Sequence, residues 1–125
     1  YIFFQNIIFF SGKYQHIFEH LPEPVFLHET NSTNSYLDEL CNNSSVEELT
    51  SVYTDFQTAG RGQRGNSWES EDGANLLFSF VLYPDFLEAR KQFYLSQITA
   101  LALQEVLSQY TDGIRIKWPN DIYWK

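Results

Sequence analysis

The stretch of this chain best suited to chemistry runs from Gln57 to Trp68 and reads QTAGRGQRGNSW. It contains three glycines and two arginines in twelve residues. Glycine lets the backbone bend and approach a ligand closely, and arginine supplies planar hydrogen-bond donors for phosphate or carboxylate. The combination predicts a loop that cradles an anion.

A second segment, IRIKWPND, lies between Ile114 and Asp121. Its period-two alternation predicts a strand whose isoleucines enter the core while Arg115 and Lys117 project together from the other side. Two interpretations stay open. The two cations either face an anionic ligand or form an ordinary solvated strand face, which is the commoner arrangement for charged side chains.

A third segment, Asn31 to Ser35, is a run of hydroxyl and amide residues between a short apolar stretch and a helical pattern. Residues of these types are favoured at the N-cap of a helix, where their side chains accept hydrogen bonds from free backbone N–H groups. The same groups could instead bind a small polar ligand at the helix start. Both interpretations remain, with plain capping the more frequent.

Composition limits the classes of partner. The 125 residues are 43% hydrophobic and 18% aromatic, enough for a globular core, and the formal net charge of -8 argues against a general nucleic-acid surface. Four of the eight cations fall in the two segments described above: Arg61, Arg64, Arg115 and Lys117. An acidic protein that concentrates its few cations in this way is expected to bind a small anion.

The only cysteine is Cys41, so no internal disulfide and no cysteine-based metal cluster are expected, which favours a reducing cytoplasm. The apolar stretch Tyr1 to Phe10 is shorter than the about 20 residues that a membrane span needs, so no membrane anchor is predicted. The sequence has no methionine, even at position 1, which indicates a fragment.

Periodicity and turn residues predict an α+β fold with a mixed, largely antiparallel sheet and helices packed on one face. In strand Ser51 to Gln57, alternation places Gln57 on the more polar face, opposite Val52 and Thr54. In the long helix, Leu95, Ile98, Ala102 and Val106 are expected to share the buried side. The predicted elements are strands at Val25–Glu29, Ser51–Gln57, Asn75–Tyr83, Ile114–Trp118 and Ile122–Trp124, a helix after Asn31–Ser35, and a helix at Lys91–Tyr110.

Four motifs, taken together, resemble biotin protein ligases. They are Ser32-Thr33-Asn34, GRGQRGNSW at Gly60 to Trp68, Gly73-Ala74-Asn75-Leu76, and KWPNDI at Lys117 to Ile122. Their order and spacing agree with that family from Val25 to Lys125, and the paired motifs are far more specific than a lone glycine-rich loop. The resemblance implies a class II synthetase-like catalytic fold. Residues 1–24 would form an N-terminal flank, and residues 25–125 the first part of the catalytic domain.

The same resemblance implies a monofunctional ligase without a DNA-binding domain, whose remaining sheet and small C-terminal domain lie beyond this chain. The isolated piece is expected to be inactive. The implied reaction condenses biotin with ATP and Mg²⁺ to biotinyl-5'-AMP, then transfers biotin to a lysine of a biotin carboxyl carrier domain. Neither nucleic acid nor membrane is an expected partner, and a homodimer is left open.

Residue roles follow from the resemblance, motif by motif. Lys117 and Arg61 would be the catalytic residues, and both would also contact biotin. The rest of the biotin site would comprise Ser32, Thr33, Asn34, Gln57, Gly62 and Gln63. The ATP or adenylate site would comprise Gly60, Arg64, Gly65, Trp68, Asn120 and Asp121. No protein metal site is implied, and no nucleophilic Ser/His/Asp or Cys/His set is needed, because catalysis would rest on positioning and electrostatics.

The chain departs from the common family pattern GRGRRGR at two positions, where Gln63 and Asn66 stand in place of basic residues. We therefore expect the adenylate to be held less tightly than in an arginine-bearing member unless Arg64 compensates. Three alternatives remain beside biotin ligation. They are a lipoate or octanoate ligase or transferase of the same superfamily, a non-catalytic biotin-binding module, and a structural fragment without activity.

Overall fold

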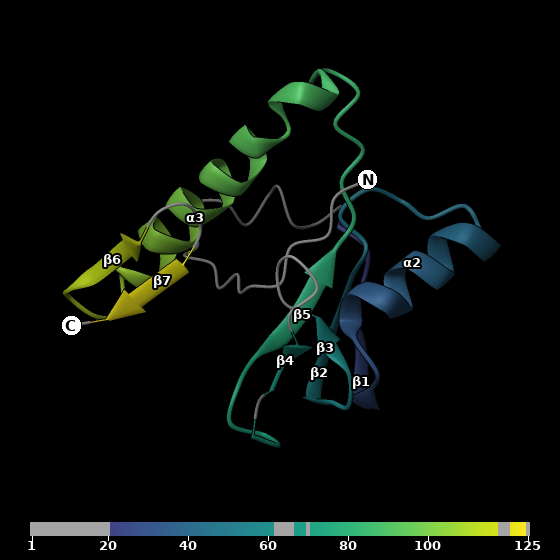
Figure 1. The fold of residues 1–125 in the computed structure, drawn as a ribbon, viewed down its shortest axis with the longest axis horizontal. Coiled ribbons are helices and arrows are strands. Elements are labelled where there is room, and N and C mark those ends of the chain that lie inside the picture. Colours follow the sequence, from purple (N-terminus) through teal and green to yellow (C-terminus); the bar gives the residue numbers. More distant parts are fainter. Residues whose placement is uncertain (1–20, 62–66, 70, 118–120, 125) are drawn as a thin grey trace. The chain divides into compact units, whose positions relative to one another are not determined.

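The computed structural model describes residues 21–61, 67–69, 71–117 and 121–124 (Figure 1). The chain divides into two compact units, with the described residues up to Tyr83 in the first and those from Pro84 in the second. Each unit is described by itself. Within the described residues, no helix is both long enough and apolar enough to cross a bilayer.

The first unit is built on a three-stranded sheet with strand order β1-β2-β5 (Figure 1). β1 pairs in parallel with β2, and β2 pairs antiparallel with β5. A separate two-stranded antiparallel ladder joins β3 to β4. The elements in chain order are β1 (Val25–Thr30), α2 (Thr33–Asn43), β2 (Ser51–Gln57), β3 (Gly60–Arg61), β4 (Ser67–Trp68) and β5 (Leu77–Phe80).

Helix α2 supplies the crossover that a parallel β1–β2 pair requires, and it packs against β2 and β5. It begins after Ser32, whose side chain accepts a hydrogen bond of 3.5 Å from the backbone N–H of Ser35. Leu37 is its fully buried residue at the core, where it joins Val52 and Val81. This apolar cluster fixes the helix start over the sheet.

The opposite face of the sheet holds a cross-strand aromatic row. Phe26 is in register with Tyr53, and Tyr53 with Phe78. The rings of Phe26 and Tyr53 have centroids 5.0 Å apart, and Phe78 stacks with Phe80 at 6.3 Å. Cross-strand pairs such as Phe26–Tyr53 stabilise a sheet, so both faces contribute to its cohesion.

The second unit consists of helical segments and a hairpin. Its elements are η3 (Ala89–Lys91), α3 (Phe93–Leu107), β6 (Ile114–Lys117) and β7 (Asp121–Trp124). β6 and β7 pair antiparallel, with Lys117 opposite Asp121 and Ile116 opposite Ile122. Helix α3 packs against this hairpin, and the Gln104 side chain donates to the Ile114 carbonyl at 3.2 Å.

The mixed α+β architecture predicted from the sequence is confirmed, as are the two helices and the closing hairpin. The predicted strand Asn75–Tyr83 is shorter in the structure, at Leu77–Phe80. The predicted buried side of the long helix is wrong in part, because Leu95 is buried while Ile98 is 60% exposed. Beside Leu95, the buried residues of α3 are Ala100 and Leu103, and within the second unit the helix packs against the β6–β7 hairpin.

The predicted orientation of Gln57 is also wrong. Alternation placed it on the polar face, but only 4% of its surface is exposed. The Thr54 hydroxyl forms a local hydrogen bond of 3.0 Å to the Phe56 carbonyl near the strand end. Beyond that point the Gln57 side chain turns to the start of α2, where hydrogen bonds to Thr33 compensate its burial.

Candidate functional site

Four polar side chains gather in the interior of the first unit, where the start of α2 meets β2 and β5. Their exposed fractions are small: 3% for Ser32, 0% for Thr33, 4% for Gln57 and 0% for Ser79. Ser32 and Thr33 begin the helix, Gln57 ends β2, and Ser79 lies within β5, in register with Val52. Polar groups buried this deeply require hydrogen-bond partners.

Most of those partners lie inside the cluster itself. The Gln57 Oε1 atom accepts from the Thr33 backbone N–H at 2.8 Å and from the Thr33 hydroxyl at 3.0 Å. The hydroxyls of Thr33 and Ser79 are 2.8 Å apart, and the Ser79 hydroxyl donates to Asn34 Oδ1. The network therefore joins four side chains from three elements.

One atom of the cluster has no such partner. The Gln57 Nε2 atom is buried and makes no hydrogen bond to any of the described residues. Leaving a buried amide donor unpaired costs about 1–3 kcal/mol, so a donor of this kind in a pocket is a candidate for ligand binding. Its orientation is set from the other end of the amide, because the Thr33 backbone N–H can bond only to the oxygen.

A cavity of about 300 Å³ lies beside this cluster, at the low end of the range for small-molecule sites. The backbone that leads to it is held against the β1–α2 turn, because the Ala59 N–H donates to the Asn31 carbonyl at 2.8 Å. Gly60 is buried at the start of β3, opposite Trp68 of β4. The lining residues are Phe56, Gln57, Thr58, Ala59, Gly60, Ser67 and Glu69.

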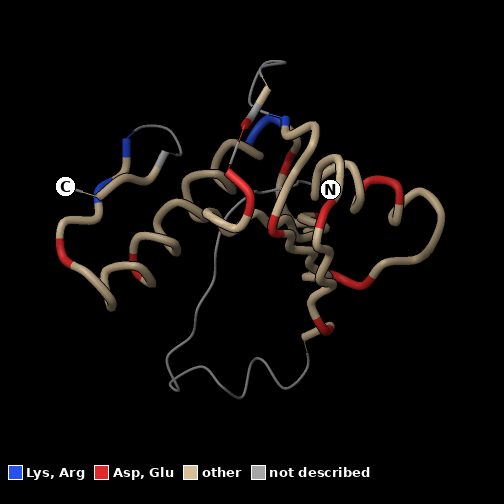
Figure 2. The backbone as a smooth tube through the Cα atoms, turned by 90° about the horizontal axis from the view of Figure 1, so that it is seen from below, with Lys and Arg blue, Asp and Glu red and all other residues tan. Residues whose placement is uncertain are grey.

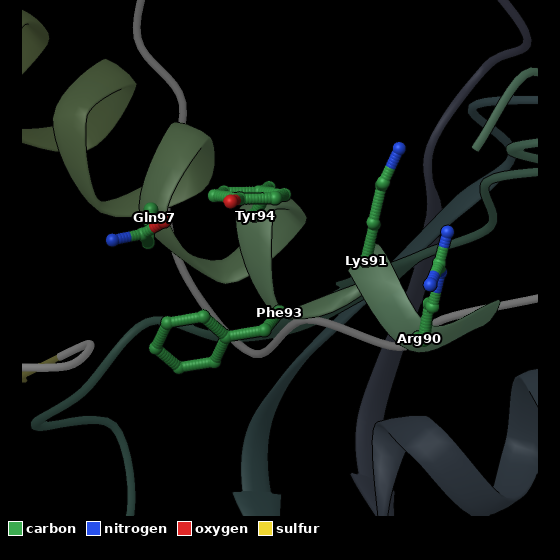
Figure 3. Close-up of a pocket in the computed structure, with 5 residues that line it drawn as sticks. All are labelled: Arg90, Lys91, Phe93, Tyr94 and Gln97. Atoms are coloured by element: carbon green, nitrogen blue, oxygen red, sulfur yellow. The ribbon is translucent and has the colours of Figure 1, made fainter. Parts of the chain in front are cut away.

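A larger depression of about 560 Å³ lies in the second unit, at the start of α3 (Figure 3). Its five lining residues are Arg90, Lys91, Phe93, Tyr94 and Gln97. Glu88 engages both of its cations, with Arg90 Nε at 2.5 Å and Lys91 Nζ at 3.2 Å from its carboxylate oxygens. Hydrogen bonds from Arg90 and then Lys91 lower the pKa of the exposed Glu88 carboxyl. This pairing offsets the positive charge, so the depression is a weaker candidate for an anion site.

Charged residues are unevenly distributed along the described backbone. Figure 2 shows Asp and Glu recurring along the chain and Lys and Arg at few places. Arg115 and Lys117 are both exposed on β6, while the alternating residues Ile114 and Ile116 are half-buried, as the sequence pattern predicted. Arg61 is exposed at the end of β3 in the first unit.

Several predicted site residues lie outside the described residues, namely Gly62, Gln63, Arg64, Gly65 and Asn120. The backbones of Trp68 and Asp121 are described, in β4 and β7. Of the predicted biotin-site residues, the structure brings Thr33, Asn34 and Gln57 into one hydrogen-bonded network, with Ser32 as the adjoining helix cap. Lys117 belongs to the second unit.

Sequence reasoning missed Ser79, which links Thr33 to Asn34. The sequence does mark this position, since Ser79 is the one polar residue in the otherwise apolar run LLFSFVL from Leu76 to Leu82.

Among the described residues, no group of three or more His, Cys, Asp or Glu side chains lies close enough together to hold a metal ion.

Residues 26–125 match the Biotin/lipoate A/B protein ligase family. The chain is 39% identical over 93 residues to the bifunctional ligase/repressor BirA of Bacillus subtilis, covering 73% of this chain and 28% of that protein. It is 37% identical over 93 residues to BirA of Escherichia coli, covering 74% and 28%. The chain thus spans less than a third of the length of these relatives.

Solved structures give the same result at the level of the fold. Biotin protein ligase from Aquifex aeolicus in complex with biotin and ATP superposes with a TM-score of 0.69 at 35% identity, over 82% of this chain and 42% of that one. The biotin acetyl coenzyme A carboxylase synthetase from Helicobacter pylori, with bound biotinylated ATP, gives 0.62 at 27% identity over 81% and 48%. On the sequence match and the shared fold, the chain belongs to the biotin/lipoate A/B protein ligase family.

Proposed function

We propose that the protein containing this chain is an ATP-dependent biotin ligase. It activates biotin as biotinyl-5'-AMP and transfers the biotinyl group to a lysine of a biotin carboxyl carrier domain. The observation that supports this most directly is the buried polar network at the start of α2, with an unpartnered Gln57 donor beside a cavity. A relative with 35% identity and the same fold is complexed with biotin and ATP.

In the proposed site the polar network binds the ring urea of biotin. A urea presents one carbonyl oxygen and two N–H groups, so it needs both donors and acceptors from the protein. Ser32, Thr33 and Asn34 supply hydroxyl and amide groups from the first turn of α2, and Gln57 supplies its amide from β2. Buried groups of this kind discriminate strongly, because a ligand that lacks the matching atoms leaves them unpaired.

The activation step brings the biotin carboxylate to the α-phosphate of ATP. Two unit charges of like sign 4 Å apart repel by about 4 kcal/mol at an effective dielectric constant of 20, so fixed cations are needed to offset the repulsion. Lys117 is proposed to contact the carboxylate and the α-phosphate, and Arg61 to contact biotin and the adenylate. The carboxylate oxygen then bonds to the α-phosphorus as pyrophosphate leaves.

The product of that step is a mixed anhydride that water would hydrolyse. The segment that begins at Gly60 and Arg61 and ends at Ser67 and Trp68 is proposed to cover it until the acceptor lysine arrives. Arg64, Gly65, Trp68, Asn120 and Asp121 complete the proposed adenylate site. Magnesium would enter with ATP, because Mg²⁺ is usually held by substrate phosphates with only one or two protein carboxylates.

Isotope exchange between pyrophosphate and ATP tests the proposal in the full-length protein. We expect exchange that requires biotin, followed by labelling of an added carrier domain at its lysine. Exchange with lipoate or octanoate in place of biotin would instead assign the protein to the lipoate branch of the family. Biotin binding without any exchange would indicate a non-catalytic binding module.

A further inference from the structure

Ser79 has no role in the proposed function, yet its hydroxyl joins two of the residues that do. It lies 2.8 Å from the Thr33 hydroxyl and donates to Asn34 Oδ1. Ser79 comes from β5, whereas Thr33 and Asn34 belong to the first turn of α2. A single buried oxygen therefore ties the helix start to a different strand.

Counting hydrogens gives this link a direction. Each hydroxyl has one hydrogen to donate. Since Ser79 gives its hydrogen to Asn34, the hydrogen between Thr33 and Ser79 must come from Thr33. The second acceptor within reach of Thr33 is Gln57 Oε1, at 3.0 Å. The Thr33 hydrogen is thus used inside the network in either arrangement.

The donors of Thr33 also determine which end of the Gln57 amide faces the network. Its oxygen faces Thr33, where it accepts from the backbone N–H and lies within hydrogen-bond distance of the hydroxyl. Its nitrogen, which carries two hydrogens, is left without a partner among the described residues and belongs to a side chain that lines the 300 Å³ cavity. The network consequently presents a donor, not an acceptor, at Gln57.

We propose that Ser79 is a positioning residue of the ligand site: it ties Thr33 and Asn34 of the first turn of α2 to β5, and so fixes the Thr33 backbone N–H that holds the Gln57 oxygen inward and leaves the amide N–H groups for an acceptor oxygen on the ligand. This inference rests on the proposed function, under which the acceptor is the carbonyl oxygen of the biotin ring urea. Ser79 acts on the ligand through other residues, because its hydroxyl is engaged by Thr33 and Asn34 and it does not line the cavity.

The test removes the Ser79 hydroxyl from the full-length protein and compares it with a matched control. Thr54 is also a buried hydroxyl residue of the same sheet, but its hydroxyl bonds to the Phe56 carbonyl, outside the network. We expect Ser79→Ala to raise the calorimetric Kd for biotin about tenfold and to leave the KM for ATP within twofold. Thr54→Val should leave both constants within twofold, with melting temperatures recorded for each variant.

A Ser79→Ala protein whose biotin Kd matches that of Thr54→Val would overturn the inference and leave the proposed function standing. A parallel rise in the biotin Kd and the ATP KM would do the same, since it indicates general loosening rather than positioning. A wild-type protein that fails to bind biotin would overturn both.

A second substitution tests the donor at Gln57 directly. Gln57→Glu keeps an oxygen facing the two Thr33 donors but replaces the N–H groups by an oxygen that only accepts when ionised. We expect at least a hundredfold rise in the biotin Kd at neutral pH. Gln57→Met, which has neither donor nor charge, should also weaken binding and separates loss of the donor from the effect of a buried charge. Biotin affinity retained in both variants would contradict the donor assignment.

Discussion

Lys117 and Arg115 provide a test of proposed catalysis at the scale of single residues. Both cations are exposed on the same face of β6, opposite the half-buried isoleucines. Charge and exposure alone therefore do not tell which of the two supports catalysis. Only Lys117 belongs to the KWPND motif. A fixed cation that stabilises charge developing in the transition state is commonly worth about 10²–10³ in rate.

We therefore expect Lys117→Met to lower the rate of biotin-dependent pyrophosphate exchange by about 10²–10³. Arg115→Met, the matched control two residues away on the same strand, should change the rate less than threefold. Equal losses in the two variants would show that strand charge, rather than one positioned ammonium group, supports the reaction.

Gln63 gives a second prediction at this scale, from the sequence, since it lies outside the described residues. With an amide where many family members have an arginine, one charge-assisted bond to the adenylate is absent. Gln63→Arg in the full-length enzyme should slow release of biotinyl-AMP. The release rate is measured by chasing preformed, labelled adenylate with unlabelled ligand. Indistinguishable rates would mean that Arg64 or another group already supplies that charge.

At the scale of elements, Leu37 is the apolar side chain of α2 that is fully buried in the core. Leu37 is fully buried against Val52 and Val81, so Leu37→Ala removes packing where the site is assembled. Substitutions of this type cost about 2–5 kcal/mol, which urea denaturation of the full-length protein measures. Leu101→Ala is the control, because Leu101 is 59% exposed on α3 and its loss should cost less than about 0.5 kcal/mol. Similar costs for the two would contradict the assignment of the core.

Features set by local sequence patterns could be predicted, whereas features set by distant residues could not. Alternation in Ile114–Lys117 and the N-cap residues before α2 are local signals, and the structure follows both. Gln57 and Ser79 were misplaced or missed because their environments are created by partners 24 and 46 residues away in the sequence. The buried side of α3 depends likewise on the hairpin that packs against it, which a helical period cannot specify.

The whole chain carries 16 acidic residues against eight cations, and Figure 2 shows Lys and Arg at few places along the described backbone. The matched relatives are much longer, since the chain covers 28% of Bacillus subtilis BirA. We therefore expect residues 1–125 alone to support no biotin-dependent exchange, while the full-length protein does. Circular dichroism of the isolated chain would separate a folded, inactive protein from an unfolded one, and exchange by the isolated chain would contradict the expectation.

The Ser79 link has a consequence for how the protein is made. The network closes only after a residue of β5 has met the first turn of α2, two segments that are 46 positions apart between Thr33 and Ser79. During synthesis the hydrogen bonds of Ser79 to Thr33 and Asn34 can form only after Ser79 has emerged and β5 has paired with β2. The complete network therefore requires β1, α2, β2 and β5 together, so a chain that ends before β5 would lack it.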